Sequence, residues 1–175
     1  MTNADKLPPE AEKLIEFLTE LGMETTTRTH PAAYTVQDAK DLRGLIKGGH
    51  TKNLFLKDKK GQLWLVVALE DTEVKLKRLP KRIGSARLSF GKAELMEEVL
   101  GVKPGSVTPF ALMNDTQHRV RVVLDERMMR HEVLNFHPLV NTATTSIKRE
   151  DFLRFLRATG HEPLIVDVTM ADDDA

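Results

Sequence analysis

Three loops of this chain combine glycine, proline and polar side chains at positions where strands are expected to begin or end. They read GGHTKN (48–53), KPGSVTP (103–109) and NFHPLVNTATT (135–145). A lysine such as Lys52 can hold a phosphate or a polarised carbonyl as a compact point charge. A glycine such as Gly105 lets the backbone come close to a ligand. Loops at strand ends often form small-molecule sites, so these residues are the candidates for chemistry.

Each loop also has a purely structural interpretation. Lys52 could be a solvated strand end, Gly105 and Pro109 could only shape a turn, and His137 could be a loop residue with one hydrogen-bonded nitrogen. The residue pattern by itself leaves both interpretations open.

Familiar catalytic and cofactor patterns are missing from the sequence. The six histidines form no H-E-x-x-H pair, which argues against a helical zinc site. G-x-S-x-G, the phosphate-binding P-loop, G-x-G-x-x-G and cysteine are all absent, so a serine or cysteine nucleophile and a dinucleotide site have no support. We therefore expect no metal and no cofactor.

Composition indicates an ordinary water-soluble domain. The chain has 175 residues, 41% of them hydrophobic and 30% charged, with a net charge of zero. No apolar run reaches the roughly 20 residues of a membrane span, and the N-terminus lacks the order of a signal peptide. We expect a cytoplasmic protein with no membrane partner. A net charge of zero also gives no indication that the protein binds DNA.

One segment departs from this balance. Six basic residues and no acidic one lie between positions 75 and 87, and they are either a solvated face or a phosphate-contacting patch: Lys75, Lys77, Arg78, Lys81, Arg82 and Arg87. The last residues, about 170–175, are acidic and predicted to form a flexible tail.

Hydrophobic spacing and turn residues predict the elements that must position the loops. Helices are expected over 9–21, 36–45, 91–101 and 148–160, the last capped by Ser146, with a basic, helix-like segment over 72–82 interrupted by Pro80. Strands are expected over 23–30, 51–58, 62–70, 86–90, 119–125, 132–136, 142–147 and 162–168. The apolar strand 62–70 should be central and covered on both faces. This alternation predicts an α/β (mixed α+β) fold, one domain over 1–175 with a central mixed sheet flanked by helices.

Four stretches, in order along the chain, resemble one known family. Residues 30–39, 48–69, 88–112 and 123–155 resemble the YbaK/ProX family of aminoacyl-tRNA editing domains, which is similar to the editing domain inserted in bacterial prolyl-tRNA synthetases. TKNLFL, GVKPGSVTPF and FHPLVNTATT resemble in particular its branch of free-standing alanyl-tRNA(Pro) deacylases (ProXp-ala).

The resemblance implies a YbaK-like fold and hydrolysis of alanine wrongly attached to proline tRNA. A pocket that accepts proline cannot strongly reject a smaller apolar rival, because a methylene is worth only about 1–3 kcal/mol, so a second, smaller site must remove the error. The implied partners are mischarged proline tRNA and, further, prolyl-tRNA synthetase or elongation factor.

The resemblance also implies roles for residues of the three loops. Lys52 matches the family's lysine essential for editing, Gly105 opens its G-x-x-x-P loop, and His137 matches a pocket histidine. The implied substrate-binding residues are Asn53, Ser106, Thr108, Pro109, Asn141 and Thr142. No side-chain nucleophile is required, because a positioned water can attack the ester, with the ribose hydroxyl of the substrate helping to orient it. A tRNA role for the six basic residues of 75–87 rests on their charge alone.

Two alternatives stay open from the sequence. The same fold could edit cysteine, serine or threonine on other tRNAs, since pocket size decides specificity. A module that binds tRNA or a synthetase without catalysis is the other possibility.

Overall fold

The computed structural model describes residues 7–32, 44 and 46–169. The helix predicted over 36–45, apart from residue 44, and the tail predicted over 170–175 lie outside these ranges. The longer helices are α1 (Pro9–Glu20), α4 (Ala93–Leu100) and α5 (Arg149–Ala158), with the single turn α3 (Leu79–Ile83) and the 3₁₀ turns η2 (Pro104–Ser106), η3 (Pro109–Asn114) and η4 (Met128–Arg130) between strands. The three longer helices were predicted from apolar spacing.

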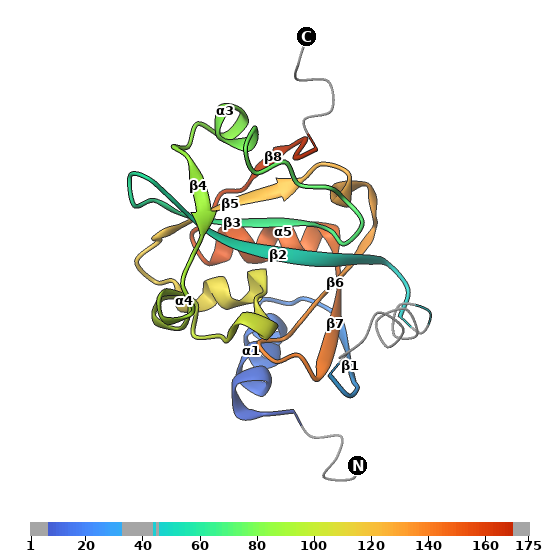
Figure 1. Ribbon diagram of the computed structural model, residues 1–175. Coiled ribbons are helices and arrows are strands. Elements are labelled where there is room, and N and C mark those ends of the chain that lie inside the picture. Colours follow the sequence, from blue (N-terminus) through green and yellow to red (C-terminus); the bar gives the residue numbers. More distant parts are fainter. Residues whose placement is uncertain (1–6, 33–43, 45, 170–175) are drawn as a thin grey trace.

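The described residues form a mixed sheet of eight strands (Figure 1). The strands are β1 (Thr25–Thr29), β2 (Gly49–Asp58), β3 (Leu63–Leu69), β4 (Leu88–Phe90), β5 (Val120–Asp125), β6 (Val133–Phe136), β7 (Ala143–Lys148) and β8 (Leu164–Val166). Seven of them follow the order β1-β7-β6-β2-β3-β5-β8, and β4 pairs with β2. The predicted fold class is confirmed.

Strand β2 joins the two halves of this sheet. Along one edge it pairs with β3 over seven residues, from Thr51 to Lys57. Along its other edge it pairs with β6 only at Gly49 and His50, and with β4 only from Leu56 to Asp58. Residues 51–54 therefore have a neighbouring strand on one side only among the described strands.

Asp58 fixes the hairpin between β2 and β3. Its buried carboxylate accepts hydrogen bonds from the amides of Lys60 (2.9 Å) and Gln62 (3.0 Å), and from Trp64 Nε1 (3.2 Å) and the Ala86 amide (3.3 Å). Burial acts to raise the pKa of this carboxyl, but the four donors outweigh it and lower the pKa. One side chain therefore holds the hairpin turn and the approach to β4.

Two apolar cores lie on opposite faces of the central strands, so β3 is buried on both faces, as predicted. The larger core packs one face against α1, α4 and α5, and includes Leu14, Phe55, Leu65, Val67, Phe110, Phe136 and Phe155. The smaller core packs the other face against α3, and consists of Leu56, Trp64, Val66, Ala68, Leu79, Ile83, Val123 and Val168. In Figure 1, α3 lies above the central strands and α1 and α4 lie below them.

Two local predictions were wrong. Pro80 does not interrupt a helix over 72–82; it stands in the first turn of α3, where a missing amide hydrogen costs nothing, and the turn ends at Gly84 with φ 74°. Ser146 does not cap α5. It lies inside β7, and Lys148 takes the cap position without a side-chain hydrogen bond.

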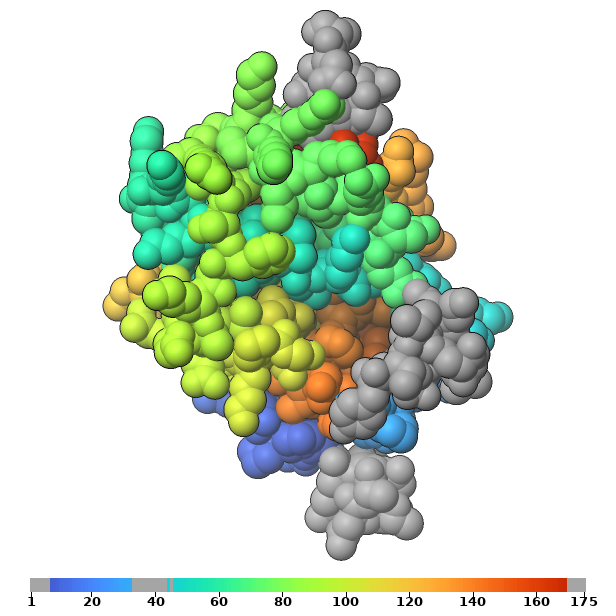
Figure 2. Space-filling view, in the orientation of Figure 1, coloured from blue at the N-terminus to red at the C-terminus, as the bar shows by residue number. Residues whose placement is uncertain are grey.

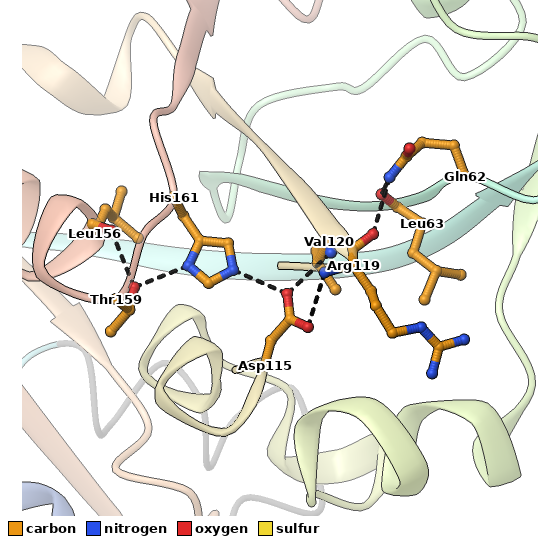
Figure 3. Close-up of polar contacts among 8 residues, drawn as sticks. All are labelled: Gln62, Leu63, Asp115, Arg119, Val120, Leu156, Thr159 and His161. Carbon is orange, nitrogen blue, oxygen red and sulfur yellow. Dashed lines mark hydrogen bonds and ion pairs between the residues drawn. The ribbon is translucent and has the colours of Figure 1, made fainter. Parts of the chain in front are cut away.

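A buried polar network ties the end of α5 to the start of β5 (Figure 3). His161 Nε2 lies 2.8 Å from Asp115 Oδ2, and both side chains are buried. The Asp115 carboxylate also accepts the amides of Arg119 and Val120, each at 2.9 Å. Breaking such a buried pair leaves an uncompensated polar group, so we interpret it as a structural anchor.

Among the described helices, none combines the length and the apolar character needed to cross a bilayer.

Candidate functional site

The side chains of Lys52 and Asn53 leave β2 on opposite faces, because successive residues of a strand alternate. Lys52 stands opposite Ala68 of the smaller core, and Asn53 opposite Val67 of the larger core. A hydrogen bond and the charge of Lys75 lower the pKa of the Glu73 carboxyl, and Lys52 adds a weaker effect of the same sign. The Lys52 ammonium is thus near the segment that follows β3.

Asn53 carries an unusual feature on the other face. Its Oδ1 is buried, and it is the one buried side-chain polar atom of the described residues that has no hydrogen-bond partner. Leaving a buried acceptor unsatisfied costs about 1–3 kcal/mol. Such an atom in a native structure calls for an explanation, and a donor supplied by a ligand is one.

The second and third loops meet beside β2. A Cβ atom at Gly105 would lie 3.4 Å from the side-chain nitrogen of Asn141, so the two loops touch. Figure 2 shows them side by side on one face, loop 103–109 in yellow and loop 137–142 in orange, beneath the teal surface of β2. Val107 and Leu139 of these loops belong to the larger core, which is the core on the Asn53 face.

The remaining residues of loop 103–109 have mixed exposure. Gly105 is exposed and Ser106 is half-buried. Thr108 and Pro109 are buried, and the Thr108 hydroxyl accepts a hydrogen bond from the Phe110 amide (3.3 Å), capping η3. In this arrangement Thr108 and Pro109 shape the loop, while Gly105 and Ser106 are open to a ligand.

His137 follows β6 directly and its ring is oriented by the backbone. Its Nδ1 lies 3.2 Å from the carbonyl oxygen of Ala143, and since a carbonyl only accepts, Nδ1 carries the proton and Nε2 keeps its lone pair. Burial lowers the pKa of His137; the Ala143 hydrogen bond opposes this shift and nearby His30 adds to it. A neutral imidazole that offers Nε2 as an acceptor is the result.

His30 is a neighbour of this site that the sequence did not single out. Its Nε2 lies 2.8 Å from the Thr144 hydroxyl, and its amide donates to the carbonyl oxygen of Thr142 (2.9 Å). The end of β1 therefore supports the loop that carries Asn141 and the exposed Thr142. In the sequence, the one sign of a role for His30 is its position at the start of residues 30–39, the first stretch that resembles the editing family.

The same loop contains a strained backbone. Leu139 has φ 68°, a region that non-glycine residues rarely adopt, and its side chain is buried. Residues held in such regions cost of order 1–3 kcal/mol and cluster at functional sites. Leu139 could not have been recognised from its residue type.

The six basic residues of 75–87 lie around α3 and its flanking turns. Lys77, Arg78, Lys81, Arg82 and Arg87 are exposed, while Lys75 is partly buried and pairs with Glu73. They form a surface patch beside the smaller core, on the Lys52 side of the sheet. No three acidic or histidine side chains in the described ranges converge into a possible metal site.

The structure thus brings together Gly105, Asn141 and the loop of His137, with Asn53 on the same face of β2. It places the Lys52 side chain on the opposite face. This placement could have been predicted from the sequence, because successive residues of a strand point to opposite faces of the sheet. The two residues are therefore neighbours in the motif but not in space.

Three comparisons with known proteins bear on these loops. The sequence model of the family described as "Aminoacyl-tRNA editing domain" matches residues 30–155. Prolyl-tRNA synthetase associated domain-containing protein 1 of Danio rerio is 40% identical over 157 residues, 89% of this chain and 85% of that protein. Prolyl-tRNA editing protein ProX of Acetoanaerobium sticklandii is 34% identical over 151 residues, 86% of this chain and 92% of that protein.

A solved structure shares the fold. The crystal structure of a proposed trans-editing enzyme for prolyl tRNA synthetase superposes with a TM-score of 0.68, covering 93% of this chain and 98% of that one at 19% identity.

Proposed function

This chain belongs to the aminoacyl-tRNA editing domain family, and on that premise we propose that it hydrolyses alanine from mischarged proline tRNA. The family relation and the relatives named for prolyl-tRNA editing support an aminoacyl-tRNA substrate. The relatives do not establish that this chain is a catalyst or that alanine is the amino acid removed, and both statements are our proposal.

The observation that carries the proposal is the unsatisfied Oδ1 of Asn53. An aminoacyl ester presents an α-ammonium group beside its carbonyl, and this group can donate the hydrogen bond that Oδ1 lacks when substrate binding uncovers the buried atom. A hydrogen bond to a charged group contributes about 1.5–3 kcal/mol, which is enough to orient a small substrate. We therefore assign the amino acid to the Asn53 face, between β2 and the loops of Gly105 and His137.

Lys52 then acts from the other face of the same strand. Its ammonium, together with the basic patch of 75–87, suits a phosphate of the terminal nucleotides rather than the amino acid. On this assignment the 3′ end of the tRNA crosses β2 at residues 51–54. The edge of β2 that faces away from β3 has no described strand partner at these residues.

The reaction needs one water and no covalent enzyme intermediate. Water adds to the ester carbonyl carbon, the carbonyl oxygen becomes an oxyanion, and the bond from carbon to the ribose oxygen then breaks. The ribose oxygen takes up the proton that the water loses, and free alanine and tRNA leave. The neighbouring ribose hydroxyl orients the water, and the neutral His137 Nε2 accepts a hydrogen bond from the substrate.

The test is hydrolysis of alanyl-tRNA(Pro) by the purified protein and by Lys52→Ala. We expect Lys52→Ala to lose about 100-fold in rate, because the terminal nucleotides are then held less accurately and a misplacement of about 1 Å can cost that much. Its melting temperature should stay near that of the wild type, because Lys52 is a partly exposed strand residue. Unfolding of Lys52→Ala would favour a structural role instead.

A panel of seryl-, threonyl- and cysteinyl-tRNAs separates the alternatives. If any of these esters is hydrolysed faster than alanyl-tRNA(Pro), the site prefers that amino acid to alanine. Tight binding of tRNA without hydrolysis of any ester would identify a non-catalytic module and refute the proposal.

A further inference from the structure

Asn135 is a buried polar residue of β6 with contacts to β7 and to the start of β2. The residue is 3% exposed. Its Nδ2 donates to the carbonyl oxygens of Lys47 (2.9 Å) and Gly49 (3.3 Å), and its Oδ1 accepts from the Ser146 hydroxyl in β7. Its own carbonyl oxygen accepts from the Thr51 hydroxyl (2.7 Å).

These partners fix the orientation of the amide. Two carbonyl oxygens can only accept, so the nitrogen must face Lys47 and Gly49, and the oxygen is left for Ser146. Every contact on the β2 side falls within residues 47–51, immediately before Lys52 and Asn53.

The backbone pairing at this junction is short. Strand β2 pairs with β6 through Gly49 and His50 alone. However, β2 carries Lys52 and Asn53, whereas β6 leads directly into the loop of His137 and Asn141. The relative placement of these two parts of the site depends on that junction, and the Asn135 contacts add three hydrogen bonds to it.

The glycine before β2 is adapted to the same contact. Gly48 has φ 105°, and a Cβ atom there would lie 2.9 Å from the carbonyl oxygen of Val133 and 3.0 Å from Asn135 Nδ2. The chain at Gly48 therefore approaches β6 more closely than any side chain would permit.

We infer that Asn135 is a positioning residue for the editing reaction: it holds the Lys52–Asn53 half of the site against the His137–Asn141 half. The inference rests on the proposed function for its kinetic consequence, and on the contacts above for its structural one. A misplacement of about 1 Å between reacting groups can cost about 100-fold in rate.

The test compares Asn135→Asp with Ser146→Ala. Asn135→Asp keeps the size of the side chain but replaces the donor to Lys47 and Gly49 by an acceptor. Ser146→Ala removes the other partner of the same amide and leaves the donor in place. We expect Asn135→Asp to lower the single-turnover rate at saturating enzyme by about 100-fold, with little change in affinity for uncharged proline tRNA, and Ser146→Ala to keep most of the rate.

Hydrogen exchange provides a readout that does not depend on activity. Asn135→Asp should speed exchange of the amides of residues 47–53, and Ser146→Ala should not. If Asn135→Asp does not fold, Thr51→Val, which removes only the hydroxyl donor to the Asn135 carbonyl, takes its place and should show the same two effects more weakly.

The outcomes separate the inference from the proposed function. A wild-type protein without deacylase activity refutes the function, and exchange at 47–53 then decides the structural role of Asn135 alone. With an active wild type, an equally active Asn135→Asp overturns the positioning role. So do equal rate losses in Asn135→Asp and Ser146→Ala that accompany equal losses of melting temperature.

Discussion

Among the single residues of the site, Asn53 is expected to lower the stability of the folded protein while it supports the reaction. Its buried Oδ1 has no partner among the described residues, and an apolar residue of similar shape removes that unsatisfied acceptor. We expect Asn53→Leu to raise the free energy of unfolding by up to about 1 kcal/mol while it lowers deacylation sharply. Denaturant unfolding and single-turnover hydrolysis measure the two effects. A destabilised Asn53→Leu would mean that the amide has a structural role.

His137 predicts a pH dependence of stability. Burial lowers the pKa of its imidazole in the folded protein, so between that lowered value and the ordinary histidine pKa the unfolded chain binds more protons. Stability is then complete above about pH 6.5 and falls as the pH drops toward the folded-state pKa. His137→Gln should remove this part of the slope, measured by unfolding between pH 7 and 5. The exposed His131 is the control: an equal effect of His131→Gln would contradict the assignment.

Among the strands and helices, the start of β2 depends on Gly48. Alanine there would combine a disfavoured backbone at φ 105° with a contact of 2.9 Å to the Val133 carbonyl. We expect Gly48→Ala to cost about 3 kcal/mol of unfolding free energy, as the sum of strain and overpacking.

Gly84 is the matched control for this substitution. It has φ 74°, but no atom of the described residues lies within 4 Å of the position that its Cβ would take. Gly84→Ala should therefore cost only about 1–2 kcal/mol, from backbone strain alone. Equal losses of the two variants in thermal unfolding would show that crowding against β6 is absent.

The sequence predicted elements better than their contacts. Hydrophobic spacing and turn residues together located the described strands and longer helices, and the unbroken apolar run of β3 indicated its burial on both faces. The prediction that Ser146 caps α5 was wrong. A serine before a helix favours a cap, but the Ser146 hydroxyl donates a hydrogen bond to Asn135 in the neighbouring strand. Contacts such as this depend on strands far apart in the chain, and local propensity does not encode them.

The candidate site was predictable only in part. Residue types and their resemblance to an editing family located the three loops, and Gly105 does lie against Asn141. The strain at Leu139, the support from His30 and the unsatisfied Asn53 acceptor arise from packing, so no single loop sequence reveals them.

Over the molecule as a whole, a net charge of zero conceals a basic patch that should respond to salt. Lys77, Lys81 and Arg87 are exposed, and each contact with a phosphate releases bound counterions. Substituting all three by alanine should weaken binding of proline tRNA and reduce the slope of log K against log salt by roughly 2–3.

A second triple variant controls for the change in net charge. Lys13, Arg127 and Arg130 are exposed basic residues outside the patch, and their replacement by alanine removes the same three charges. Equal slopes for the two variants would show that the patch makes no particular contact with tRNA.

The proposed function requires the molecule to hydrolyse alanine, and not proline, from proline tRNA. Single-turnover hydrolysis of alanyl- and prolyl-tRNA(Pro), prepared on the same tRNA and mixed with excess protein, measures this discrimination in one experiment. We expect hydrolysis of the alanyl ester well above its rate in buffer, no acceleration for the prolyl ester, and loss of the alanyl activity in Lys52→Ala. An alanyl ester that decays only as fast as in buffer, or a prolyl ester removed equally fast, would contradict the proposed function.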